Sequence, residues 1–254
     1  MSRIVVVHGV FNELWGPHEV HQRWLPAVRD GLWHHGVTID DADVGVGFYG
    51  DLFRHAADQR PDDKELRRVA DESGLLDVVQ QAAGRDTLES LAKLIGLATL
   101  RRVVDQAGRY FAQPEVRAAV RVRVERAITP ATRVVVAHSL GSIVAYEVLA
   151  MHPEWSIAAF VTIGSPLSNI RFMHRIEPAI VEGRGVWPAC VQSWTNVAAV
   201  DDAPCGEGRL APIFGDRVQD IRVDNGHRAH DPEPYLNAAA TGAAIAAGLG
   251  KRPS

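Results

Sequence analysis

Cysteine is scarce in this 254-residue chain, which has only Cys190 and Cys205. Two cysteines cannot form a disulfide framework, so the stability of the fold is expected to come from its hydrophobic core. Cys190 stands at the start of a predicted strand, where a small buried side chain is expected. We do not expect a Cys190–Cys205 bridge.

Long hydrophobic runs are also missing. No apolar stretch reaches the length needed to span a bilayer. The N-terminal residues lead directly into a short strand-like segment and show none of the regions of a signal peptide. We therefore expect a cytoplasmic protein without stable membrane insertion.

Neither sign of charge is in large excess. The formal net charge is −4, and acidic and basic residues are interspersed along the chain. This pattern excludes an extended nucleic-acid-binding face or a polybasic membrane patch. The histidines do not fall in an H-E-x-x-H or similar frame, so we expect no metal and no cofactor. With 46% hydrophobic and 23% charged residues, the composition fits one globular domain over residues 1–254.

Residues 134–149 form the most informative segment. They begin with an apolar β-branched run, typical of a strand buried on both faces, and end with apolar residues at helical spacing. Ser139 lies between the two parts, flanked by Ala137 and Gly141. This is the G-x-S-x-G nucleophile elbow with alanine in the first small position. The alternative is an ordinary strand–turn–helix whose serine caps the helix.

A second motif follows the first predicted strand, residues 4–7, where the chain reads His8-Gly9. Together with A-H-S-L-G-S around Ser139, this resembles the lipase and esterase branch of the α/β-hydrolase superfamily. The resemblance implies acyl transfer by a Ser-His-Asp triad. His8 itself is expected to hold its loop in place, because the chemistry here requires the backbone.

In this superfamily two backbone N–H groups form an oxyanion hole. By position, Val10 supplies one of them, with Phe11 as the next candidate. Leu140, directly after the nucleophile, supplies the other.

The same resemblance implies the order serine, acid, histidine along the chain. Asp201 and Asp202 both follow the fifth predicted strand, and we favour Asp202 because it precedes Ala-Pro as in related proteins. His227 and His230 both follow the sixth strand. We favour His230, which opens an H-x-x-x-x-Tyr-Leu run similar to that of related hydrolases.

The predicted architecture is an α/β fold with about six mostly parallel strands and helices on both faces. It corresponds to a compact α/β-hydrolase fold that lacks the first two strands of larger members. The predicted strands are residues 4–7, 44–49, 134–137, 157–163, 191–197 and 218–223. The principal predicted helices are residues 19–34, with a kink or fresh start at Pro26, 114–127 and 235–249.

The alternation of strands and helices breaks at about residues 54–112. Helices are predicted from Arg60-Pro61 onward, at 75–79 and at 86–104. Insertions at this position form lids in the superfamily, so we predict a helical lid or cap. The alternative is that these helices simply pack against the domain.

Ser165 is a rival candidate for the nucleophile, and Asp51 is a further candidate carboxylate. Ser165 follows the fourth predicted strand, but it lacks the elbow frame, and Pro166 after it has no N–H for an oxyanion. Asp51 is more typical of a turn or cap residue than of a catalytic acid.

The expected function is hydrolysis of a small-molecule carboxylic ester or thioester through an acyl-enzyme. The first alternative is an acyltransferase, thioesterase-type or cyclising enzyme that uses the same triad. The second is a non-catalytic binding protein on a hydrolase fold.

Overall fold

The computed structural model describes residues 2–56, 58–73, 97–169, 174–205 and 208–251. They form a three-layer α/β fold around a six-stranded sheet with the order β2-β1-β3-β4-β5-β6. Every neighbouring pair of strands is parallel. The strands are β1 (Ile4–Val7), β2 (Val44–Gly47), β3 (Val134–His138), β4 (Ile157–Ile163), β5 (Val191–Ala199) and β6 (Val218–Val223). The α/β class and the six strands of the sequence prediction are thereby confirmed.

Helices cover both faces of the sheet, and side-chain alternation along each strand assigns its residues to two cores. Val5 and Val7 face a core shared with α7 (Pro114–Ala127) and α8 (Leu140–Met151). Ile4 and Val6 face a second core shared with the other helices. These are α1 (Pro17–Trp33), α11 (Pro232–Leu236) and α12 (Ala239–Gly248).

Helix α1 is continuous through Pro26, so no new helix starts there. Pro26 lies on the exposed side of the helix, where water can solvate the carbonyl that loses its N–H partner. The predicted C-terminal helix, residues 235–249, was wrong in extent. It consists of α11 and α12, separated at Ala238 by extended backbone.

The remaining short elements connect the strands. They are η1 (Asp41–Asp43), η2 (Gly50–Phe53), η4 (Pro166–Ser168), η5 (Ala203–Cys205), α10 (Ala211–Phe214) and η6 (Gly226–Arg228). Within the described ranges, no helix combines the length and hydrophobicity required to cross a bilayer. Cys190 and Cys205 are both buried free thiols, and the burial predicted for Cys190 is confirmed.

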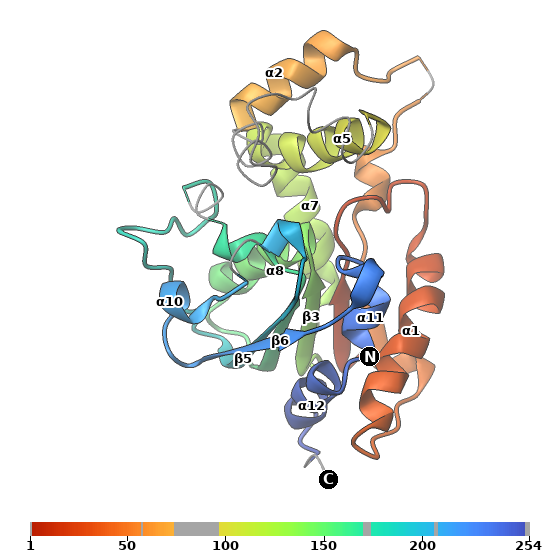
Figure 1. Ribbon diagram of the computed structural model, residues 1–254, viewed down its shortest axis with the longest axis vertical. Helices are drawn as coiled ribbons and strands as arrows, with labels where there is room; N and C mark the ends of the chain where they lie inside the picture. The colour runs from red at the N-terminus through yellow and green to blue at the C-terminus, as the bar shows by residue number, and fades with distance from the viewer. Residues whose placement is uncertain (1, 57, 74–96, 170–173, 206–207, 252–254) are drawn as a thin grey trace.

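The insertion contains α2 (Asp63–Ser73), α5 (Leu97–Val103), the π-helical turn η3 (Val104–Gly108) and α6 (Arg109–Ala112). Figure 1 shows α2 and α5 at the end of the molecule opposite the C-terminus. Val69, Val104 and Tyr110 join the same core as α7 and α8. The predicted helix at 75–79 and most of the predicted helix at 86–104 lie outside the described residues.

A buried ionic cluster fastens the insertion to α8. Glu147 on α8 is fully buried and accepts hydrogen bonds from Tyr110 on α6 and from Arg117 and Arg121 on α7. The Arg121–Glu147 ion pair measures 2.8 Å. Arg117 and Arg121 also pair with Glu177, so two carboxylates balance the two guanidinium groups.

Candidate active site

The polar residues of interest gather at the carboxyl ends of the parallel strands. The loops after β1 and β3 leave the sheet where its strand order reverses, because β2 extends it in one direction and β4, β5 and β6 in the other. In open α/β sheets, ligands bind in the crevice at such a switch point. The loop from His8 and the turn at Ser139 flank this crevice.

Ser139 occupies a strained turn between β3 and α8. Its φ of 51° and ψ of −129° lie in a region that non-glycine residues rarely adopt. The chain passes very close to the loop after β1 at this point. A Cβ at Gly141 would lie 2.3 Å from the His8 carbonyl oxygen, and one at Gly9 would lie 2.7 Å from Ser139 Cβ. Both positions therefore require glycine for the two segments to meet.

The structure brings three of the predicted residues together in one hydrogen-bonded chain. Ser139 Oγ lies 2.9 Å from His230 Nε2, and His230 Nδ1 lies 2.7 Å from Asp202 Oδ1. The Asp202 side chain is fully buried, whereas the His230 ring keeps 30% of its surface exposed. Because Nδ1–H donates to the carboxylate, Nε2 is the ring nitrogen available to accept the serine proton.

Two further side chains hold the second oxygen of Asp202. Tyr235 donates its hydroxyl to Oδ2 at 2.5 Å, and the Cys205 thiol donates at 3.1 Å. Burial alone raises the pKa of Asp202, but the hydrogen bonds from His230, Tyr235 and Cys205 outweigh it and lower that pKa. Asp202 is therefore an ionised, fixed partner for His230 at neutral pH.

The N–H of Val10 is oriented by the hydrogen bonds of the preceding carbonyl. Gly9 O accepts from His8 Nδ1 at 2.7 Å and from Asn12 Nδ2 at 3.2 Å. Because C=O and N–H point in opposite directions in a trans peptide, the Val10 N–H is directed away from these two side chains.

The same principle orients the N–H of Leu140. The Ser139 carbonyl accepts from Ser142 Oγ at 2.6 Å and from Ser142 N at 2.9 Å. Ser142 Oγ also lies 2.7 Å from Ser165 Oγ, and Ser165 accepts from Leu167 N at the start of η4. Ser165 is therefore part of the hydrogen-bonded support of the turn that carries Ser139.

Two buried histidines stabilise the loops around the site. His8 donates from Nδ1 to Gly9 O and accepts at Nε2 from Tyr49 N–H at 3.2 Å. His138 Nε2 donates to the His230 carbonyl at 2.9 Å and so fastens the His230 loop to β3. Burial lowers the pKa of His8 to about 4 and that of His138 to about 3, so both are neutral at pH 7.

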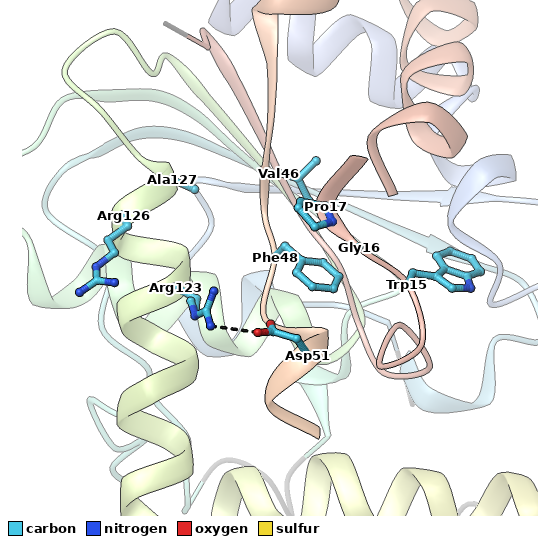
Figure 2. A pocket seen from close by; sticks show the side chains of 9 residues that line it. All are labelled: Trp15, Gly16, Pro17, Val46, Phe48, Asp51, Arg123, Arg126 and Ala127. Atoms are coloured by element: carbon cyan, nitrogen blue, oxygen red, sulfur yellow. Dashed lines mark hydrogen bonds and ion pairs between the residues drawn. The ribbon is translucent and has the colours of Figure 1, made fainter. Parts of the chain in front are cut away.

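The alternative candidates lie apart from this chain. Asp201 is exposed with a φ of 63°, and His227 is exposed in η6. Asp51 forms an ion pair with Arg123 of α7 at 2.9 Å, on the wall of a cavity of about 480 Å³ beside β2 (Figure 2). That ion pair gives Asp51 a partner outside the Ser139–His230–Asp202 chain.

Sequence reasoning missed several residues that support the site. The sequence placed Tyr235 in a run similar to that of related hydrolases but predicted no role for its hydroxyl. It predicted no role in the site for Ser142, Cys205 or Gln106. Tyr235 and Gln106 bind partners 33 and 95 positions away, which no local spacing reveals. Ser142 and Cys205 each bind a residue three positions back, but neither belongs to a motif that assigns it a role. In the part of the chain that the structure describes, no cluster of three or more histidine, cysteine or acidic side chains is arranged to hold a metal ion.

No protein-family model, curated protein sequence or solved structure matches this chain. The chain therefore has a three-layer α/β fold with an all-parallel sheet and no family assignment.

Proposed function

We propose that this protein is a serine hydrolase of the α/β-hydrolase type that cleaves a carboxylic ester or thioester. The observation that carries the proposal is the hydrogen-bonded chain from Ser139 through His230 to Asp202, with distances of 2.9 and 2.7 Å. Support also comes from the turn at Ser139, which faces the crevice at the switch point of the sheet.

In the proposed reaction, His230 Nε2 takes the proton of Ser139 as Oγ attacks the carbonyl carbon. The Val10 and Leu140 N–H groups stabilise the negative oxygen of the tetrahedral intermediate. His230 then donates its proton to the leaving alcohol or thiol, and an acyl-Ser139 remains. Water, deprotonated by His230, releases the acid and restores the serine.

Asp202 keeps its charge throughout this cycle. Its carboxylate holds the Nδ1–H tautomer of His230 and stabilises the imidazolium that forms when the serine proton is taken. The donors from Tyr235 and Cys205 prevent Asp202 from rotating away, because they hold its other oxygen.

The test is the intact mass of the protein after treatment with a fluorophosphonate, followed by peptide mapping of the adduct. We expect one adduct on Ser139 of the wild type and none on Ser139→Ala. Ser193→Ala is the matched control, because the Ser193 hydroxyl donates to a β4 carbonyl, that of Ala158, at 2.8 Å. It should be labelled as the wild type is.

Turnover of ester and thioester panels completes the test. Ser139→Ala should lower turnover by about 10³-fold or more. Near-normal turnover of this variant, or an adduct mapped to another serine, would refute the assignment. A folded wild type without any adduct would favour a non-catalytic binding protein.

A further inference from the structure

Two side chains of the insertion, Gln106 and Arg102, contact the loop after β1. Gln106, in the π-helical turn η3, is 2% exposed, and its Oε1 accepts the Phe11 N–H at 2.9 Å. Arg102 of α5 approaches the same residue, with its guanidinium carbon 4.7 Å from the centre of the Phe11 ring. Arg102 also donates from Nε to Glu13 Oε1 at 2.7 Å. These contacts from the insertion hold Phe11 and Glu13 in place.

Phe11 requires such support because its backbone is unusual. Its φ of 73° lies in the left-handed region, which bulky non-glycine residues seldom adopt. A residue keeps such a conformation only when the surrounding contacts impose it. The hydrogen bond to Gln106 is the contact made by the Phe11 N–H itself.

The peptide unit held by Gln106 adjoins the Val10 N–H. The Phe11 N–H and the Val10 carbonyl belong to one planar peptide, and Asn12 Nδ2 donates to that carbonyl at 3.0 Å. Gln106 and Asn12 therefore fix both ends of this plane. Since the two peptides share the Val10 Cα, a displacement of this plane that shifts the Cα also moves the Val10 N–H.

We infer that Gln106 is a positioning residue that keeps the Val10 N–H aimed at the oxyanion, an inference that rests on the proposed function. The π-helical turn fits this role, because such turns carry an extra residue and recur at functional sites. The insertion is then part of the catalytic arrangement, and a change in its position alters the rate of acyl transfer.

The experiment compares the wild type with Gln106→Leu and Gln106→Asn. Leucine fills a similar volume without an acceptor, and asparagine keeps the amide but is one carbon too short to reach Phe11. Ser73→Ala is the matched control. Ser73 is buried in the same insertion near Gly108, and its hydroxyl donates to Ala70 O.

Two readouts are measured. The first is kcat and KM on the best ester, where an oxyanion donor acts mainly in the transition state. We expect kcat to fall by about 10- to 100-fold in both Gln106 variants with KM within about twofold of wild type. The second is hydrogen exchange of the backbone amides of residues 8–13, which should accelerate by about tenfold or more in the variants. Ser73→Ala should change neither.

Unchanged exchange of residues 8–13 in both variants would overturn the inference, whether or not the protein is a hydrolase. Unchanged kcat in an active enzyme would overturn it while leaving the proposed function intact. A wild type without fluorophosphonate labelling refutes the proposed function and with it the catalytic role of Gln106. The exchange data then still decide whether Gln106 holds the loop. If Gln106→Leu does not fold, Gln106→Asn supplies the same comparison.

Discussion

Replacing Tyr235 by phenylalanine tests how firmly the acid of the site is held. The Tyr235 hydroxyl is in a fully buried side chain, donates to Asp202 Oδ2 at 2.5 Å and accepts the Ala199 N–H at 2.8 Å. Burial raises the pKa of this phenol, so it is a donor at every ordinary pH. The substitution removes the hydroxyl and leaves the rest of the ring in place.

The expected loss follows from the two partners. A hydrogen bond to a charged group contributes about 1.5–3 kcal/mol, and an N–H left buried without an acceptor costs about 1–3 kcal/mol. Tyr235→Phe should therefore lower the free energy of unfolding by about 3 kcal/mol or more. It should also raise the pKa of Asp202, because one of the donors that lower it is gone.

The assay is equilibrium urea unfolding at pH 7, with Tyr146→Phe as the matched control. The Tyr146 hydroxyl donates to one neutral acceptor, the Val186 carbonyl at 2.9 Å. Its removal should cost about 1 kcal/mol. If the two variants lose the same free energy, the Tyr235–Asp202 hydrogen bond is no stronger than a neutral one, and our account of how Asp202 is held is wrong.

Two further predictions concern stability. Glu147→Gln should lower the free energy of unfolding by about 3 kcal/mol, because Arg117 and Arg121 lose their buried carboxylate and keep only the exposed Glu177 among the described residues. Urea unfolding measures this, and a loss below about 1 kcal/mol would contradict it. His8 and His138 have lowered pKa values, about 4 and about 3, so the unfolded chain binds more protons below about pH 6.5. The free energy of unfolding should therefore fall between about pH 6.5 and 4, by about 1.4 kcal/mol per pH unit for each histidine. Urea unfolding at pH 7, 6 and 5 checks this, and a flat profile would refute it.

The strands could be predicted from the sequence because each is a short apolar run whose burial decides its conformation. β1, β4 and β6 have the predicted bounds, while β2 ends at Gly47, two residues early. The sheet class followed from the strand–helix alternation.

The C-terminal helix shows where local pattern was insufficient. Residues 235–249 are rich in alanine, which favours a single helix, yet the backbone is extended at Ala238. Tertiary contacts explain the break. A Cβ at Gly31 of α1 would lie 2.3 Å from the Leu236 carbonyl oxygen, and one at Gly242 of α12 would lie 1.9 Å from the Gly31 carbonyl oxygen. The two C-terminal helices therefore pack backbone to backbone on α1, in a geometry that one straight helix does not provide.

Ser139, Asp202 and His230 could be selected from the sequence because each lies in the turn or loop that follows a strand, in an order that a family resemblance supplies. The structure brings these three side chains together, and their catalytic roles stay predictions. The residues that orient them could not be selected in this way. Gln106 lies 95 positions from Phe11 and Tyr235 lies 33 positions from Asp202, so only the folded chain joins them.

The two proposed oxyanion donors, the N–H groups of Val10 and Leu140, are oriented in the same way. In each case, side chains bind the carbonyl oxygen of the peptide that contains the N–H. On the nucleophile side, Ser142 holds the Ser139 carbonyl. On the loop side, His8 and Asn12 hold the Gly9 carbonyl. None of these side chains needs to touch a substrate, yet each restricts a dipole before charge develops. Such preorganisation stabilises a transition state because no dipole has to reorient during the reaction. We propose that Gln106 extends this restraint into the insertion. It would thereby link the segment that the family resemblance does not cover to the proposed chemistry at Ser139.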